Sequence, residues 1–155
     1  MLKVSFKDTP EQPSKVVQRF NDKVTTVTLT GSMPWDFKIF MPLEIMSWVI
    51  DHPFVDSKWS GKITIRTIGT AKRADGDVDN PILAERIAES RAKIKIYRFV
   101  SLFLKKVCKL HYASLFGNAK SLPSMGWGGL IGELTRYNNL LFKEEEHLNQ
   151  LLEKA

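Results

Sequence analysis

The stretch from Asn80 to Gly117 reads NPILAERIAESRAKIKIYRFVSLFLKKVCKLHYASLFG. Asn80 is a good N-cap, and Pro81 suits the first helical position because no amide donor is needed there. Gly117 and Asn118 favour a left-handed stop at the other end. Because no other Pro or Gly interrupts the stretch, it predicts one long central helix over 80–117.

The cations of this helix gather on one side. Successive residues lie about 100° apart around a helix axis, which places six cations on one strip: Arg91, Lys95, Arg98, Lys105, Lys106 and Lys109. Most of the remaining circumference is apolar, with one strip around Phe99 and Phe103 and another around Ile87 and Ile94. Such a helix is buried on most sides and presents its cationic edge to solvent or to a partner. We call this edge the basic stripe.

The positive charge of the chain is concentrated in this helix. The 155 residues carry 23 Lys and Arg against 17 Asp and Glu, a formal charge of +6. Residues 86–109 hold eight of these cations and one acid, Glu89. Intrahelical ion pairs therefore do not account for the stripe, and its charge favours an anionic partner. The alternatives are pairing with Glu144–Glu146 and a plain solvated face.

The N-terminal half predicts mainly strands. Val24–Thr30 and Lys62–Ile68 alternate in the manner of half-buried strands, and Leu2–Phe6 and Trp35–Met41 show the same period. Ser14–Phe20 predicts a short helix. Residues 43–51 stay open between a short helix and a strand.

The C-terminal part predicts a loop and a second helix. Residues 118–129 are rich in Gly, Ser and Pro, and the helical period returns over 130–153. The apolar stripe of that helix consists of Leu130, Leu134, Tyr137, Leu141, Leu148 and Leu152. Strands followed by helices predict an α+β fold, in which a small antiparallel sheet from the N-terminal half packs against the long central helix and the C-terminal amphipathic helix. One domain is expected over 1–155, with residues 1–70 mainly strands.

A second cationic position lies where the sheet meets the central helix. Lys72 and Arg73 precede an acidic turn that contains Asp75, Asp77 and Asp79. A helix N-terminus holds phosphates well, but three carboxylates repel an anion, so an acidic turn that complements the helix dipole is the favoured interpretation. The spacing of the acids does not continue as a calcium-binding EF-hand.

A resemblance to a known class of protein is found in residues 62–92. They combine a strand, a G-x-A-K turn (Gly69–Lys72) and a helix start of pattern A-x-x-x-A-x-x-R-A (Ala84–Ala92). This layout resembles small bacteriophage proteins of a double-stranded-RNA-binding-like β-β-β-α shape. Double-stranded-RNA-binding domains place a Lys-Lys pair at the helix N-terminus, where this chain has Ile82 and Leu83. The resemblance implies a phage-encoded accessory protein.

Signatures of an enzyme are sparse. His52, His111 and His147 stand apart from one another, without neighbours at metal-ligand spacing. The single cysteine, Cys108, excludes an internal disulfide and is predicted to be a small buried hydrophobe. No catalytic residue, cofactor or metal is expected. The lack of a run of about 18 apolar residues predicts no membrane partner and a cytoplasmic protein.

These features predict a non-enzymatic module that binds a nucleic acid or a nucleotide. The residues expected to contact phosphates are Lys72, Arg73, Arg91, Lys95, Arg98, Lys105 and Lys109. In a phage-encoded protein, such binding would take place in the host cytoplasm, and one use would be to sequester a host defence nucleotide signal. The alternative is an assembly protein, such as a virion component, that forms a homo-oligomer through its apolar helices.

Overall fold

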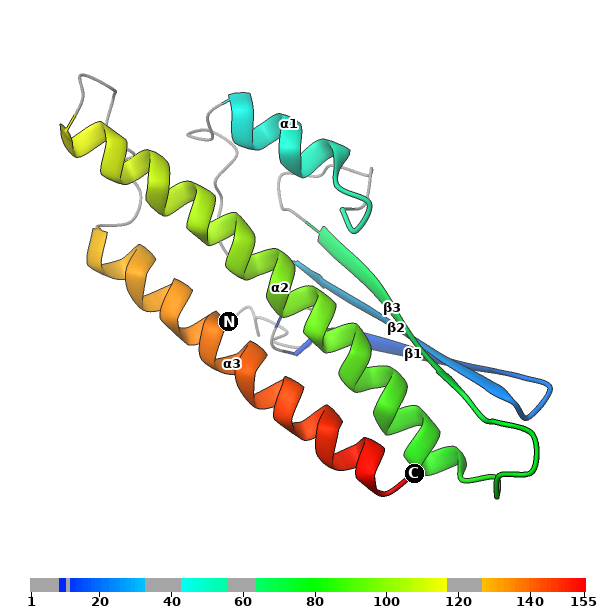
Figure 1. Ribbon diagram of the computed structural model, residues 1–155. Coiled ribbons are helices and arrows are strands. Elements are labelled where there is room, and N and C mark those ends of the chain that lie inside the picture. The colour runs from blue at the N-terminus through cyan, green and yellow to red at the C-terminus, as the bar shows by residue number, and fades with distance from the viewer. Residues whose placement is uncertain (1–8, 11, 33–42, 56–63, 117–126) are drawn as a thin grey trace, which may run out of the picture.

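The computed structural model describes residues 9, 10, 12–32, 43–55, 64–116 and 127–155. Its elements, in chain order, are β1 (Ser14–Phe20), β2 (Val24–Ser32), α1 (Leu43–Asp51), β3 (Thr64–Lys72), α2 (Pro81–Phe116) and α3 (Trp127–Glu153). The predicted strands at 2–6 and 35–41 lie outside the described residues, as does the predicted helix stop at Gly117. The α+β fold predicted from the sequence is confirmed (Figure 1).

The sheet is antiparallel, with strand order β1-β2-β3. In its register, Val27 of β2 lies opposite Val17 of β1 on one side and Gly69 of β3 on the other. The odd-numbered side chains of β2 and β3, such as Val27 and Ile65, are buried on the face that packs against α2, whereas all residues of β1 are exposed. The even-numbered side chains of the three strands point to the opposite face, on which none of the described helices packs. We call this the open sheet face.

The long helix α2 lies between the sheet and α3 (Figure 1). Its N-cap is Asn80, whose side-chain Oδ1 accepts a hydrogen bond of 3.1 Å from the Leu83 amide. Both apolar strips of α2 pack against other parts of the chain, and Ala92, Ile96 and Phe103 are fully buried. The predicted central helix is therefore confirmed within the described residues, as is its burial on most sides.

Helix α3 packs antiparallel to α2 through the predicted apolar stripe, with two corrections. Tyr137 is buried beside Tyr97, with 6.3 Å between ring centroids. Leu151 is buried and Leu152 is 41% exposed, so the last stripe position was assigned one residue too late. The helix begins at Trp127, so residues 127–129 belong to its first turn and not to the predicted loop.

Two expectations about strands were wrong. Ser14–Phe20 is strand β1, paired along its whole length with β2, and not a helix. Strand β3 does not end in a turn at Gly69 but continues to Lys72. A Cβ atom at Gly69 would collide with the Ala88 carbonyl and the Ala92 amide of α2. This glycine therefore allows the helix to approach the strand closely.

Residues 43–51, which the sequence left open, form helix α1. It lies beside the C-terminal half of α2, near the start of β3 (Figure 1). The Trp48 ring of α1 stacks on Phe99 of α2 at 5.2 Å. The His52 ring, just after α1, packs edge-on against the same Phe99 at 4.6 Å. Aromatic contacts of this kind fix α1 on α2.

Candidate functional site

Three cations of the basic stripe line one groove. Arg91, Lys95 and Arg98 follow one another at intervals of four and three residues, so they leave α2 on the same side. They line a hollow of about 360 Å³ together with residues of β3 and α3. The other lining residues are Gly69, Thr70, Ile94 and Leu148. We call this hollow the basic groove.

Two of these cations also cover the outer edge of β3. Arg91 Nη1 donates a hydrogen bond of 2.6 Å to the Thr70 carbonyl, and Lys95 Nζ donates one of 2.6 Å to the Ile68 carbonyl. The second half of β3 is an edge of the sheet, where unpaired carbonyls invite pairing with another chain. A guanidinium carries five N–H donors and an ammonium three. Each group therefore keeps donors for an anion in the groove.

The third cation, Arg98, reaches α3. Its Nη2 lies 3.3 Å from Glu145 Oε1, and the two side chains are 60% and 43% exposed. One acid of Glu144–Glu146 thus pairs with the stripe, as the alternative from the sequence suggested. An exposed pair of this kind contributes only about 0–1 kcal/mol. It is therefore easily exchanged for contact with a phosphate.

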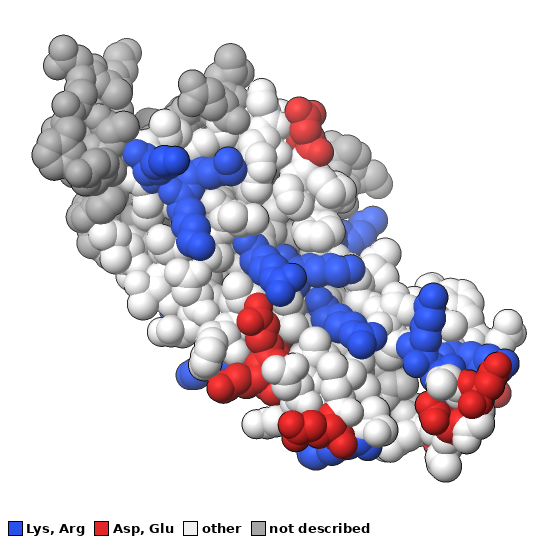
Figure 2. Space-filling view, viewed as in Figure 1, with Lys and Arg blue, Asp and Glu red and all other residues white. Residues whose placement is uncertain are grey.

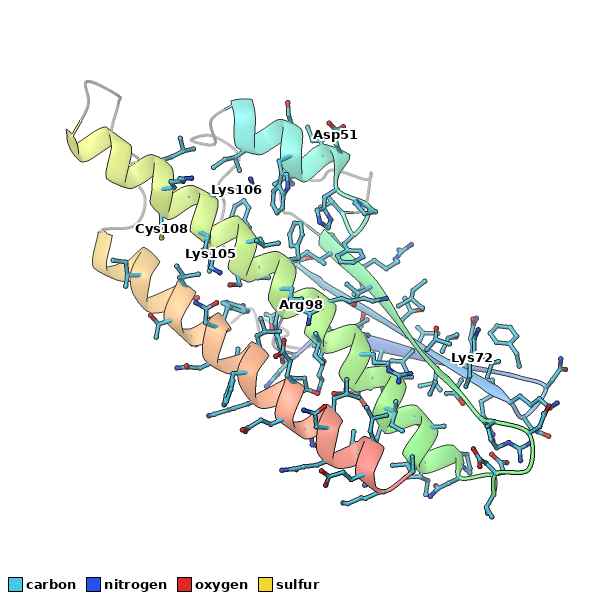
Figure 3. The ribbon with its side chains drawn as sticks, in the orientation of Figure 1. Asp51, Lys72, Arg98, Lys105, Lys106 and Cys108 are labelled. Atoms are coloured by element: carbon cyan, nitrogen blue, oxygen red, sulfur yellow. The ribbon has the colours of Figure 1, made fainter. Side chains whose placement is uncertain are left out.

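The C-terminal half of the stripe is more open. Lys105 and Lys109 are exposed, and neither forms an ion pair with any described residue. Lys106, between them, places its Nζ 5.1 Å from the centroid of the Trp48 ring, which is a cation–π contact. Figure 3 shows Arg98, Lys105 and Lys106 in sequence along α2.

Lys and Arg side chains gather along one line on this side of the molecule. Figure 2 shows Lys and Arg side chains in a diagonal run that follows α2, with acidic side chains beside the run. With a rise of 1.5 Å per residue, the stripe from Arg91 to Lys109 extends along about 27 Å of helix. Within this length the cations form two groups, Arg91–Arg98 and Lys105–Lys109, with the exposed Leu102 between them.

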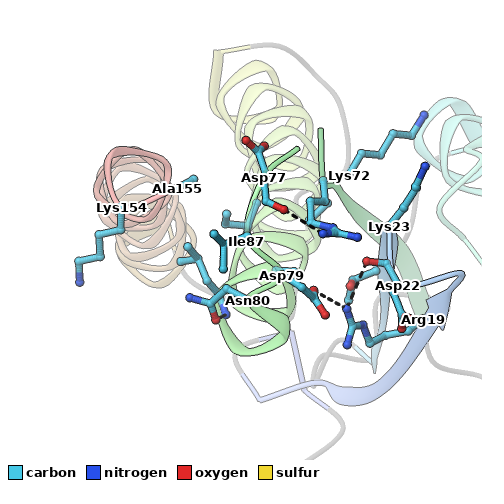
Figure 4. Close-up of a pocket in the computed structure, with 16 residues that line it drawn as sticks. Arg19, Asp22, Lys23, Lys72, Asp77, Asp79, Asn80, Ile87, Lys154 and Ala155 are labelled. Carbon is cyan, nitrogen blue, oxygen red and sulfur yellow. Dashed lines mark hydrogen bonds and ion pairs between the residues drawn. The ribbon is translucent and has the colours of Figure 1, made fainter. Parts of the chain in front are cut away.

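Lys72 and Arg73 lie elsewhere. Lys72 ends β3 on the open sheet face, opposite Val24 and away from α2. Arg73 binds locally, since its amide donates to the Lys23 carbonyl (2.7 Å) and its Nη1 to the Asp77 carbonyl (2.9 Å). Both residues line a second hollow, of about 380 Å³, at the start of α2 (Figure 4). The structure does not bring them into the basic groove.

The acidic turn beside this second hollow pairs with the β1–β2 hairpin. Arg19 Nη2 lies 2.8 Å from Asp79 Oδ1, and Lys23 Nζ lies 2.9 Å from Asp75 Oδ1. The sequence did not reveal these partners because Ser14–Phe20 was assigned to a helix. A hairpin signal was present in Asn21 and Asp22, residue types that tolerate positive φ and have φ of 52° and 58° here.

Cys108, Tyr97 and Tyr137 are part of the core, and the half-buried His52 packs at its edge. Cys108 is buried, and burial raises the pKa of its thiol. Burial also raises the pKa values of Tyr97 and Tyr137 to about 12 and lowers that of His52. His52 Nδ1 accepts a hydrogen bond of 3.2 Å from the Phe54 amide. These groups therefore serve packing, and none of them lines the basic groove.

Comparisons of the chain with family models, with curated proteins and with solved structures each found no match. Among the described residues, no helix combines the length and apolarity needed to cross a membrane. No three His, Cys, Asp or Glu side chains of the described ranges gather as a group that would hold a metal ion.

Proposed function

We propose that the chain is a non-enzymatic module whose basic stripe binds the phosphates of a nucleic acid. The observation that supports the proposal is that one helix carries both the cations of the basic groove and further exposed lysines. Arg91, Lys95 and Arg98 converge on the basic groove, and the exposed Lys105 and Lys109 continue the same surface. Nucleic-acid affinity comes largely from such cations, because they release the counterions condensed on the phosphates.

The length of the stripe favours a polymer over a single nucleotide. Phosphates along one strand of B-DNA are spaced at about 3.4 Å, so the stripe spans roughly eight of them. Five contacts predict a slope of log K against log salt of about −4.5 for a duplex and −3.5 for a single strand. Between 50 and 200 mM salt, affinity should then fall about 100- to 500-fold.

A small nucleotide is the second form of the same proposal. The basic groove alone, at about 360 Å³, is at the lower end of the volumes of small-molecule sites. Sequestration of a host defence nucleotide by a phage-type accessory protein belongs to this form. A nucleotide that binds tightly would raise the melting temperature by mass action, whereas a polymer binder would show little shift with nucleotides.

The test is fluorescence anisotropy with labelled oligonucleotides of mixed sequence at 50 and 200 mM salt. The variant carries Arg91→Gln, Lys95→Gln and Arg98→Gln. Its matched control loses three cations outside the stripe, through Lys23→Gln, Lys143→Gln and Lys154→Gln. We expect the stripe variant to lose at least 10-fold in affinity relative to the control. Because the two variants have the same net charge, such a difference comes from the position of the cations. No binding by the unmodified protein at 50 mM salt would contradict the nucleic-acid form.

The assembly alternative rests on a different observation. The apolar strips of α2 pack inside the chain, so self-association would need another apolar surface. The open sheet face offers one, since Val16 is 57% and Phe20 is 51% exposed. Sedimentation of the unmodified chain at micromolar concentration checks this alternative. A monomer would count against it, whereas a stable oligomer that binds no oligonucleotide would favour it.

A further inference from the structure

The basic groove lies at one end of the cationic row on α2. Toward the start of the helix, the positions that precede Arg91 on the same side, such as Ala84 and Ile87, carry no charge. In the other direction the row continues to Lys105 and Lys109. A chain of phosphates that follows the stripe toward the start of α2 therefore meets its last cations in the groove.

The edge of β3 adds a backbone donor to these cations. In β3 the N–H and C=O groups of even-numbered residues point away from β2, as the hydrogen bond of 2.7 Å from the Arg66 amide to the Phe54 carbonyl shows. The Thr70 amide therefore points to this outer edge, and no described residue accepts a hydrogen bond from it. An amide in this position is available to an acceptor from outside the chain.

Two cations flank this amide. Along the edge of the strand, the Thr70 N–H lies between the carbonyl groups of Ile68 and Thr70. Lys95 binds the first of these carbonyl groups and Arg91 binds the second, each at 2.6 Å. Because Arg98 lines the same hollow, three cationic groups and one backbone N–H are available to a single anion there.

This set of donors suits a phosphomonoester better than a phosphodiester. A phosphomonoester carries a charge of about −1.5 to −2 at pH 7 and offers three acceptor oxygens, whereas each phosphodiester of a nucleic-acid strand carries one negative charge. One carboxylate, that of Glu145, pairs with a cation of the groove, and this pair with Arg98 is exposed and weak. The groove therefore has positive charge in excess of what one internal phosphate neutralises.

We propose that the basic groove binds the terminal phosphate of the nucleic acid whose other phosphates contact the basic stripe. This inference rests on the proposed function and narrows it to strands that end in a phosphomonoester. The following phosphates lie along α2 toward Lys105 and Lys109. An internal phosphate suits the groove less well, because the strand would have to continue past Arg91, where the row of cations ends.

The experiment measures how well unlabelled oligonucleotides displace a labelled one at 50 mM salt. Three single-stranded 12-mers of one sequence carry a 5′-phosphate, a 3′-phosphate or hydroxyl groups at both ends. A 14-mer with hydroxyl ends has the same charge as the phosphorylated 12-mers, because two extra phosphodiesters replace one dianionic phosphate. We expect one of the phosphorylated 12-mers to bind about 10- to 100-fold more tightly than the 14-mer, as for a hydrogen bond to a charged group.

Two single variants of equal net charge locate the preference. Arg98→Gln removes a cation of the groove whose ion pair with Glu145 is exposed, and Lys109→Gln removes a cation at the far end of the stripe. We expect Arg98→Gln to abolish most of the preference for the phosphorylated end. Lys109→Gln should weaken all the oligonucleotides alike and keep the preference. Melting temperatures of both variants should equal that of the unmodified protein.

The outcomes separate this inference from the function on which it rests. Equal binding of the 14-mer and both phosphorylated 12-mers overturns the terminal-phosphate site. The phosphate-binding stripe then still stands if the variant with Gln at 91, 95 and 98 loses affinity. A preference that survives Arg98→Gln also overturns the site, because the terminal phosphate then binds elsewhere. An unmodified protein that binds none of the oligonucleotides refutes both this inference and the nucleic-acid form of the proposed function.

Discussion

The covering of the β3 edge by two cations predicts a loss of stability that can be worked out from the structure. Replacing Arg91 and Lys95 together by Met keeps unbranched side chains of high helix propensity. It removes the two hydrogen bonds of 2.6 Å to the carbonyl groups of Thr70 and Ile68. Hydrogen bonds from charged donors contribute about 1.5–3 kcal/mol each. Arg91 is half-buried and Lys95 is exposed, so solvent competes, and we expect a loss of about 2–3 kcal/mol for the pair.

The assay is thermal unfolding followed by circular dichroism. In a domain of this size, 1 kcal/mol corresponds to about 2–4 °C, so the double variant should melt about 4–12 °C lower. The control replaces Lys105 and Lys109 by Met, which removes two exposed cations that have no ion pair among the described residues and should shift the melting temperature by less than about 2 °C. An uncovered edge should also promote self-association, visible in sedimentation. Equal melting temperatures for the two double variants would refute the edge-covering role.

Two further predictions concern the core. Gly69→Ala should lower the melting temperature by several degrees, because its Cβ would collide with the α2 backbone at Ala88 and Ala92. The control is Gly132→Ala, which has open space around it and should leave stability equal or slightly higher. Equal effects of the two changes would contradict the close packing of α2 on β3 at Gly69. Burial lowers the pKa of His52 below its usual 6.5, so the unfolded chain binds the proton first and stability should fall as pH drops through the range just below 6.5. In His52→Asn, the side-chain oxygen replaces Nδ1 as the hydrogen-bond acceptor. The free energy of unfolding, measured with urea, should then differ less between pH 5.5 and 7.5 than in the unmodified protein. An equal difference would exclude His52 as the source of the pH dependence.

The long helix was predictable because its signals are local. Asn80 caps it in sequence and in structure, and its apolar strips repeat with the helical period. Strand β1 was not predictable in this way, because all seven of its residues are exposed. A strand with no buried face has no alternation of apolar and polar residues to reveal it. Its structure depends on pairing with β2, which a seven-residue window does not contain.

The candidate site was likewise predictable only where it depends on local sequence. The angular position of Arg91, Lys95 and Arg98 follows from spacing along one helix. Arg91 and Lys95 also bind carbonyl groups of β3. These contacts depend on how closely α2 packs on the sheet, and Gly69 allows that close approach. Lys72 was grouped with the stripe because β3 was expected to end before it. The strand continues instead, and its alternation turns Lys72 to the open sheet face.

The central claim, that the basic stripe binds nucleic-acid phosphates, is tested most directly by the salt dependence of oligonucleotide binding in Lys105→Gln/Lys109→Gln. Both lysines are exposed and form no ion pair with the described residues, so folding should be unchanged. Each lysine that contacts a phosphate contributes about one unit to the slope of log K against log salt. The account predicts a slope that is less steep than in the unmodified protein by about 1.4 units for a single strand or about 1.8 units for a duplex, with the same melting temperature. A slope equal to that of the unmodified protein would contradict it.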